Sequence, residues 1–188
     1  PAKPRSGDES FRLIFVGRLE SEKGVETILR AMAQSQVASL SLDVVGSGSL
    51  RDRLQRQASV ARLNVRFWGM LSDVEVHALL SQSDLLIAPS IDSSTGREQW
   101  GRSVVEAMFT GIGVLVSDGG ELPLLVSDTD CVFPQNDERN LAAKIQRLAA
   151  DRSLLRSKAQ QMFKRSKRFE PALLARRLTN FWQTVMNT

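Results

Sequence analysis

The chain has 188 residues, of which 42% are hydrophobic and 24% charged, and its formal net charge is +4. This composition is typical of one globular domain, and no apolar run approaches the roughly 20 residues that span a bilayer. A single histidine and a single cysteine, Cys131 in the apolar run DCVFP, exclude an internal disulfide and the usual zinc ligand sets and predict a buried structural thiol.

The first residues, PAKPRSGDES, have neither an initiator methionine nor a hydrophobic signal core. We interpret residues 1–10 as a linker, and we expect the chain to be a piece of a longer protein.

Six short β-type runs alternate with helical patterns, which predicts an α/β fold with a six-stranded parallel sheet flanked by helices. The strands are expected at 11–17, 40–46, 64–69, 84–90, 113–117 and 130–134, and the helices between them at 24–35, 49–62, 73–83, 101–109 and 140–151. From residue 151 the chain reads as helical, with Pro171 opening a last helix. Ligands bind a doubly wound sheet at the carboxyl ends of its strands, so the loops after the first four strands are the candidate sites.

The loop after the first strand, GRLESEKG, carries two cations. Gly17 allows a sharp turn, and Arg18 and Lys23 follow the carboxyl end of the strand. A diphosphate needs about two positive charges, and a guanidinium binds two oxygens at once. The loop therefore suits a diphosphate, although on spacing alone a charged surface loop explains it equally well.

The loop after the second strand, GSGSL, begins like the dinucleotide fingerprint G-x-G-x-x-G. Its sixth position is Arg51 rather than glycine, and the motif does not follow the first strand. The loop therefore gives little support to an NAD site. Gly48 is interpreted as a residue that lets the loop approach a ligand or begin the helix tightly.

The stretch REQWGRSVVEAM follows the fourth strand and holds two carboxylates, Glu98 and Glu106, with seven residues between them. Helical periodicity begins near Arg102, so Glu98 is expected in the loop and Glu106 in the second helical turn. The unpaired amides at the helix start would attract an anion, and each carboxylate would accept hydrogen bonds from two neighbouring sugar hydroxyls. Solvated glutamates beside a helix start remain an open alternative.

Seven motifs follow one another along the chain: VGRLESEKG, VVGSGSL, VRFWGML, SDLLIAPS, REQWGRSVVEAM, VLVSDGGELP and CVFPQND. By these motifs the chain resembles, over almost its whole length, the C-terminal nucleotide-sugar-binding domain of the retaining glycosyltransferases of family 4, which have the GT-B fold. The E-x7-E pair is the most specific single element, and the ordered set is stronger than any one motif. The resemblance implies a Rossmann-like six-stranded parallel sheet with extra C-terminal helices, one half of a GT-B fold.

The resemblance also implies roles for individual residues. Arg18 and Lys23 would bind the donor diphosphate and stabilise it as the leaving group. Glu98 would contact the donor sugar near the reacting centre, and Glu106 would hold the ribose hydroxyls. The loop from Trp68 to Leu71 would line the nucleobase, and the amides at 101–103 would contact the phosphates or the sugar. The further candidate substrate-binding residues are therefore Gly17, Gly48, Trp68, Gly69, Met70, Leu71, Gly101, Arg102 and Ser103.

The implied activity is transfer of a hexose-type sugar from a nucleotide sugar, such as a UDP or GDP sugar, to an acceptor hydroxyl, with retention and without a metal or other cofactor. Residues 11–169 would form the nucleotide-sugar-binding domain, and residues 170–188 a helix that crosses back to an N-terminal acceptor domain. Without that domain the chain is expected to be inactive. The parent protein is expected in the cytoplasm, with peripheral contact at a membrane surface as an open question.

Three other classes of function compete with this one. An NAD-dependent oxidoreductase domain lacks support, because the third glycine is missing and Asp43 lies inside the second strand rather than at its end. A non-catalytic sensor of nucleotide sugars would share the same site and stays open. A nucleic-acid-binding module is the weakest reading, because the cations, including the cluster KRSKR at 164–168, form no single stripe with aromatics between them.

Overall fold

The structure is a computed structural model that describes residues 10–92 and 101–170. Its centre is a six-stranded sheet in the order β3-β2-β1-β4-β5-β6, in which all neighbouring strands pair in parallel. The prediction of a parallel α/β sheet flanked by helices is confirmed. The chain order reverses between β1 and β4, which is where a doubly wound sheet opens a crevice for ligands.

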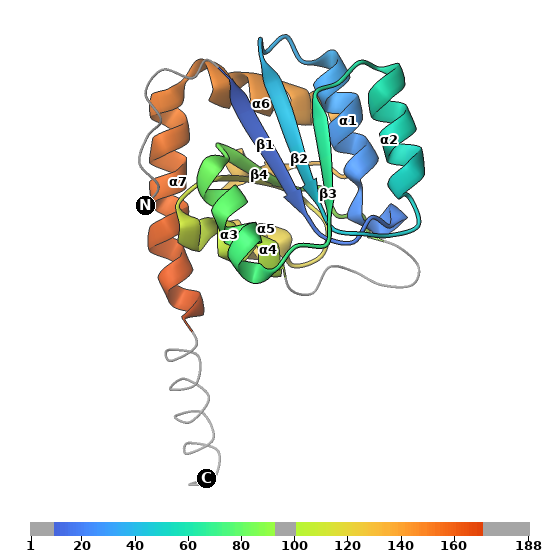
Figure 1. The fold of residues 1–188 in the computed structure, drawn as a ribbon. Helices are drawn as coiled ribbons and strands as arrows, with labels where there is room; N and C mark the ends of the chain where they lie inside the picture. The colour runs from blue at the N-terminus through green and yellow to red at the C-terminus, as the bar shows by residue number, and fades with distance from the viewer. Residues whose placement is uncertain (1–9, 93–100, 171–188) are drawn as a thin grey trace, which may run out of the picture.

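The elements carry the labels of Figure 1. The strands are β1 (Phe11–Val16), β2 (Leu40–Val45), β3 (Val65–Gly69), β4 (Leu85–Ala88), β5 (Gly113–Ser117) and β6 (Val132–Phe133). The α-helices are α1 (Val25–Gln34), α2 (Arg51–Val60), α3 (Asp73–Gln82), α4 (Arg102–Thr110), α5 (Leu122–Val126), α6 (Glu138–Ala150) and α7 (Arg152–Ser166). Three short 3₁₀ helices are η1 (Ser21–Lys23), η2 (Thr129–Cys131) and η3 (Lys167–Phe169).

The elements predicted between residues 11 and 151 are present, with ends shifted by at most two residues. Helix α5 was not predicted, and residues 130–131 belong to η2 rather than to the last strand. The helical end of the chain begins as a separate helix, because the Asp151 carboxylate accepts a hydrogen bond from the backbone N–H of Leu154 at 2.8 Å and so caps α7. The helix predicted to open at Pro171 lies outside the described residues.

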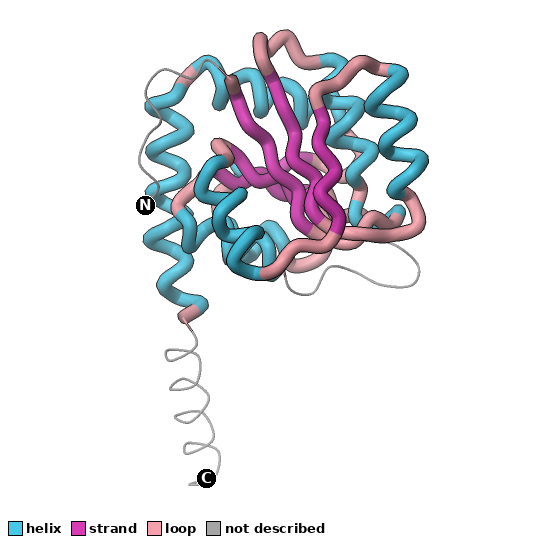
Figure 2. Tube along the Cα trace, in the orientation of Figure 1, coloured by secondary structure: helices cyan, strands magenta, loops and turns pink. Residues whose placement is uncertain are grey.

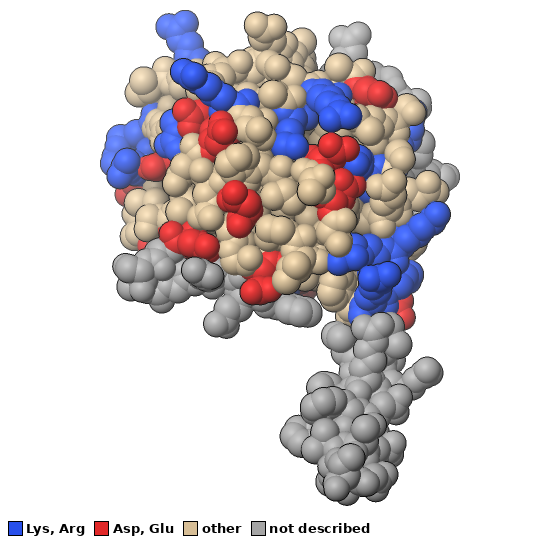
Figure 3. Space-filling model, turned by 180° about the vertical axis from the view of Figure 1, so that it is seen from behind, with Lys and Arg blue, Asp and Glu red and all other residues tan. Residues whose placement is uncertain are grey.

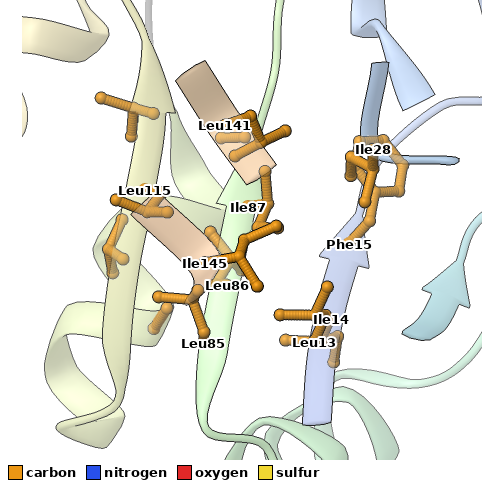
Figure 4. Packing of buried hydrophobic residues seen from close by; sticks show 14 of the residues in the cluster. Leu13, Ile14, Phe15, Ile28, Leu85, Leu86, Ile87, Leu115, Leu141 and Ile145 are labelled. Carbon is orange, nitrogen blue, oxygen red and sulfur yellow. The ribbon is translucent and has the colours of Figure 1, made fainter. Parts of the chain in front are cut away.

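Helices cover both faces of the sheet (Figures 1 and 2). Helix α1 packs against α2 and α6 on one face, while α4 packs against α3, α7 and β4 on the other. The core between these layers is continuous: β4 is buried along its whole length, and Ile28 of α1 and Leu141 and Ile145 of α6 are fully buried. Figure 4 shows side chains of β1, β4 and β5 meeting those of α1 and α6.

Backbone hydrogen bonds join the loops at the carboxyl ends of the strands. The N–H of Gly46, after β2, donates to the carbonyl of Gly69 at the end of β3, at 2.7 Å. The N–H of Ile91, after β4, donates to the carbonyl of Glu22 in the loop after β1, at 2.8 Å. The candidate loops named by the sequence therefore form one edge of the molecule.

The surface carries charges of both signs. Figure 3 shows them interspersed over the face seen from behind, with basic groups gathered where α7 ends. The last turn of α7 and the following η3 carry Lys164, Arg165, Lys167 and Arg168. Among the described residues, no helix combines the length and the apolar character that crossing a bilayer requires.

Candidate functional site

A pocket of about 720 Å³ opens at the carboxyl edge of the sheet. Its walls come from the ends of β1, β2 and β4 with the loops that follow them, from the β3–α3 loop and the start of α3, and from the start of α4. The predicted site residues that line it are Gly17, Arg18, Lys23, Gly48, Met70, Leu71, Gly101, Arg102, Ser103 and Glu106. The structure thus brings ten of the predicted residues, from four separate stretches of sequence, to one cavity.

The β1–α1 loop brings cations to the pocket. Lys23 is the last residue of η1, whose turn is closed by the hydrogen bond from the Lys23 N–H to the Glu20 carbonyl at 3.0 Å. The Arg18 side chain is 68% exposed, and its Nη2 donates to Oε1 of Glu22 at 2.7 Å. Because a guanidinium has about five N–H donors, this ion pair leaves donors for a ligand.

Gly48 allows the β2–α2 loop to lie directly against the β1–α1 loop. A Cβ atom at this position would stand 2.5 Å from the carbonyl oxygen and 2.7 Å from the backbone nitrogen of Leu19. Backbone hydrogen bonds tie the two loops on either side of the glycine, from Leu19 N–H to the Ser47 carbonyl at 2.8 Å and from Leu50 N–H to the Leu19 carbonyl at 3.0 Å. Any side chain here would push the cation-bearing loop away.

Glu20, which the sequence analysis did not single out, also lines the pocket. Its carboxylate accepts hydrogen bonds from the Ser49 hydroxyl at 2.6 Å and from the Ser49 N–H at 2.9 Å. These hydrogen bonds, the hydroxyl's first, lower the pKa of Glu20 below its ordinary value. The group is therefore an anion at neutral pH, and it fastens the cation-bearing loop to the start of α2. Its partner is 29 residues away, so only the fold reveals the contact.

Helix α4 presents its amino end to the pocket. The first backbone hydrogen bond of the helix runs from Val105 N–H to the Gly101 carbonyl at 3.0 Å, so the amides of Arg102, Ser103 and Val104 precede it. No side chain of the described residues caps this end. A Cβ on Gly101 would lie 2.7 Å from a methyl group of Leu122, so the glycine lets α5 pack closely beside the helix start. Amides at the start of a helix attract anions.

The starts of α3 and α4 contribute a second cluster of charged side chains to the pocket wall. The Arg102 Nε donates to Oε1 of Glu106 at 2.7 Å, and Nη2 approaches both carboxylate oxygens of Asp73 at 3.2 and 3.3 Å. The hydrogen bond to Glu106, followed by the charges of Glu106 and Asp73, raises the pKa of Arg102. Glu106 lies in the second turn of α4, as predicted. Asp73, the first residue of α3, was not singled out from the sequence.

The described wall of the pocket is therefore not uniformly positive. It has three cations and three acids: Arg18, Lys23, Arg102, Glu20, Asp73 and Glu106. Arg18, Glu20 and Lys23 share the β1–α1 loop, whereas the other three lie between α3 and α4. The β1–α1 loop thus contributes two cations and one acid, which on balance suits phosphate, and the α3–α4 group contributes two acids and one cation, which on balance suits hydroxyl groups.

The β3–α3 loop contributes only part of what was predicted. Met70 and Leu71 line the pocket, and Met70 is 75% exposed. Trp68 and Gly69 are not among the residues that line it, and the role of Trp68 beside a nucleobase stays a prediction. The Trp68 Nε1 donates to the Asp43 carboxylate at 2.7 Å, and Arg66 lies over the indole ring at 5.0 Å. Residues two apart on a strand share a face, so Trp68 lies on the same face of the sheet as Arg66.

The same contact bears on the NAD alternative. Asp43 lies within β2, paired with Arg66 of β3, and its carboxylate is engaged by Trp68. The acid at the end of the second strand that holds the ribose in dinucleotide-binding domains therefore has no counterpart in Asp43.

The remaining predictions concern Glu98, Cys131 and metals. Glu98 lies outside the described residues. Cys131 is buried, at 2% exposure, and burial raises the pKa of its thiol to about 12, as befits a structural residue. Within residues 10–92 and 101–170, no three His, Cys, Asp or Glu side chains gather in a way that could hold a metal ion.

The fold and the position of the pocket define a doubly wound α/β domain with a pocket at the carboxyl edge of a parallel sheet, where ligands bind in such folds. The chain belongs to the family described as "Glycosyl transferases group 1", whose sequence pattern matches residues 1–169.

Three known proteins illustrate the similarity. A phosphatidyl-myo-inositol mannosyltransferase of Mycolicibacterium smegmatis is 26% identical over 182 residues, which cover 94% of this chain and 46% of that protein. The catalytic domain of cholesterol-α-glucosyltransferase from Helicobacter pylori has a TM-score of 0.79 at 19% identity, covering 85% of this chain and 99% of that one. Anabaena HepE in complex with UDP and glucose has a TM-score of 0.82 at 23% identity, and the match covers 93% of this chain and 48% of HepE. The fold matches that of GT-B glycosyltransferases, and the chain spans less than half the length of the first curated relatives that it matches.

Proposed function

We propose that this chain is the C-terminal, donor-binding domain of a retaining glycosyltransferase of family 4. It binds a nucleoside diphosphate sugar, and the complete protein transfers the hexose-type sugar to an acceptor hydroxyl. The observation that carries this proposal is the meeting of Arg18, Lys23, the amino end of α4 and Glu106 in one pocket. Those groups are chemically suited to the two polar parts of a nucleotide, its diphosphate and its ribose.

The volume of the pocket and the ligands of a structural relative support the proposal. A volume of about 720 Å³ lies within the range of roughly 300–1,000 Å³ that small-molecule sites occupy. HepE has been captured with UDP, with UDP-glucose, and with UDP and glucose together. Since the chain spans only part of its relatives, we propose that an N-terminal domain supplies the acceptor site and that this domain alone is inactive.

The chemistry follows from where charge develops. As the bond between the sugar and the diphosphate breaks, negative charge grows on the diphosphate and positive charge on the sugar ring. Arg18, Lys23 and the α4 amides stabilise the leaving diphosphate, in the part that a metal ion plays elsewhere, so the reaction is proposed to need no metal or other cofactor. Glu106 holds the ribose through its hydroxyls, and Glu98 is proposed to contact the sugar that is transferred.

The test is calorimetric titration of the chain with UDP, GDP, ADP and NAD. We expect a nucleoside diphosphate to bind and NAD to bind much more weakly. Arg18→Ala or Lys23→Ala should weaken binding of the diphosphate at least about tenfold, because each removes a hydrogen bond between charged groups.

Arg56→Ala is the matched control, because Arg56 is an exposed arginine of α2 that does not line the pocket. Equal weakening by Arg56→Ala would indicate a general effect of charge. Preference for NAD, or undiminished binding in both pocket variants, would refute the proposed function.

A further inference from the structure

Arg102 stands between two carboxylates that come from different helices. Its Nε donates to Glu106 one turn further along α4, and its Nη2 reaches Asp73 on α3. The two acids thus contact different nitrogens of one planar guanidinium. A planar group held at two nitrogens by two separate partners has a more closely defined orientation than a single contact gives.

The contact with Glu106 alone would not fix that orientation. It is an i, i+4 pair on a helix surface, and such exposed pairs are weak and readily exchanged with water. Asp73 adds an anchor from outside the helix. The three side chains differ in exposure, at 89% for Asp73, 69% for Arg102 and 34% for Glu106, so the carboxylate of Glu106 is the best shielded of the three.

Asp73 is itself well placed to serve as an anchor. It is the first residue of α3, and the preceding Ser72 forms a capping box with Glu75, in which each side chain accepts a hydrogen bond from the other's backbone N–H. The cap fixes the backbone at Asp73 independently of Arg102. The Asp73 carboxylate is therefore presented from a rigid helix start.

The arrangement leaves Glu106 able to bind a ligand. Each carboxylate oxygen has two lone pairs, and Arg102 uses one of them on Oε1. The remaining lone pairs on both oxygens can accept hydrogen bonds from a pair of neighbouring hydroxyls. Without Arg102, the Glu106 side chain could turn to other rotamers, and its repulsion from Asp73 would be uncompensated.

We propose that Arg102 is a positioning residue that Asp73 holds in place, and that together they fix Glu106 in the orientation that selects ribose over 2′-deoxyribose nucleotides. This inference rests on the proposed function, in which Glu106 accepts hydrogen bonds from the ribose hydroxyls. It adds Asp73 to the site and assigns the Arg102 side chain to the sugar end of the nucleotide rather than to its diphosphate.

The experiment measures a ratio of affinities rather than an affinity. UDP and GDP and their 2′-deoxy forms are titrated into the chain, and the weakening caused by loss of the 2′-hydroxyl is compared between variants. For the unsubstituted chain we expect the better-binding diphosphate to bind about tenfold or more tightly than its deoxy form, the value of one hydrogen bond to a charged acceptor.

In Arg102→Gln this ratio should fall to about threefold or less, with the deoxy nucleotide bound nearly as well as before, and Asp73→Asn should lower it to an intermediate value. Arg102→Lys keeps the charge but donates from a single nitrogen at the end of a flexible stem instead of from two nitrogens held in one plane, so it should behave like Arg102→Gln. Retention of the full ratio in Arg102→Lys would overturn the geometric part of the proposal.

Matched controls come from α2, which has ten residues, as α3 does. Asp52→Asn removes an exposed acid from its first turn, and Arg56→Gln removes an exposed arginine. Neither residue lines the pocket, and neither change should alter the ratio. Thermal unfolding confirms that each variant is folded, and if Arg102→Gln does not fold, Asp73→Asn at an exposed helix start carries the test.

The outcomes separate this inference from the proposed function. If Arg102→Gln and Asp73→Asn weaken ribose and deoxyribose nucleotides by the same factor, the two residues do not position Glu106 and the inference is overturned while the nucleotide site stands. The same holds if the unsubstituted chain binds UDP or GDP without regard to the 2′-hydroxyl. If it binds neither nucleotide, the proposed function fails and the inference fails with it.

Discussion

Gly48→Ala is expected to disrupt the site by displacing the loop that carries Arg18 and Lys23. The added methyl group would lie close to three backbone atoms of Leu19: 2.5 Å from the carbonyl oxygen, 2.6 Å from the carbonyl carbon and 2.7 Å from the nitrogen. An ordinary contact at such atoms is longer by close to 1 Å, so one backbone must move by a large part of that distance. Backbone, unlike the end of a flexible side chain, cannot turn aside.

The movement cannot be absorbed locally, because hydrogen bonds bracket the glycine. Leu19 bonds to Ser47 on one side and to Leu50 on the other, at 2.8 and 3.0 Å. Overpacking of this kind typically costs about 1–3 kcal/mol. For a domain of this size that corresponds to a decrease in melting temperature of roughly 2–12 °C, and a displaced cation loop should also lose affinity for nucleoside diphosphates.

Differential scanning calorimetry measures the first effect and titration with UDP and GDP the second. Gly17→Ala is the control for stability, since its Cβ would meet only the end of the Phe15 ring, at 3.1 Å, and side-chain atoms can shift. If Gly48→Ala melts at the same temperature as Gly17→Ala, close approach of the two loops is not the reason for the glycine, and the reasoning is wrong.

Three further predictions concern two titratable groups, Glu20 and Cys131. Because the pKa of Glu20 is lowered in the folded chain, its hold on Ser49 contributes stability at neutral pH that is lost as the pH falls below the ordinary value of 4.5. Glu20→Gln should therefore melt below the unsubstituted chain at pH 7, and the gap should close in acid; a gap that widens in acid would contradict this. The thiol of Cys131, with its pKa raised to about 12, should resist thiol reagents at pH 8 unless denaturant is present, and complete labelling of the native chain within minutes would show that the thiol is not buried. Since its folded pKa is the higher one, its contribution to stability should be intact below pH 9.0 and decline as the pH rises toward 12, a decline that Cys131→Ala should reduce.

Much of the fold was predictable because its central strands are largely buried on both faces. Such strands read as short apolar runs between turn signals, and β4 and β5 are buried at every position. Helix α5 could not be found in this way. It has only five residues, Leu122–Val126, which is too short to show a helical period in the sequence. In the structure its Leu122, Leu125 and Val126 are buried.

The residues of the candidate site were also predictable only in part. Residues that follow strands in a parallel sheet had to converge on one edge, and Arg18, Lys23 and Glu106 do line one pocket there. The contact of Glu20 with Ser49 and that of Arg102 with Asp73 each join residues 29 positions apart, on loops or helices that no local pattern connects.

Trp68 is a residue for which the structure adds contacts that the resemblance did not give. The family resemblance placed a whole loop at the nucleobase, and the alternation of side chains along β3 turns Trp68 to the face of the sheet, where it meets Asp43 and Arg66. Trp68 lies inside β3, whereas Met70 follows the end of the strand at Gly69. The sequence pattern of a strand that ends at a glycine is therefore sufficient to distinguish the two residues, because only the second belongs to the loop.

The most direct measurement is a crystal structure of the chain with a bound nucleoside diphosphate. We predict phosphate oxygens within hydrogen-bond distance, roughly 2.7–3.2 Å, of the Arg18 or Lys23 nitrogens, and a ribose hydroxyl oxygen within about 3 Å of the Glu106 carboxylate. A nucleotide bound away from this pocket, or bound in it with the diphosphate beside Glu106 and the ribose beside Lys23, would contradict the account.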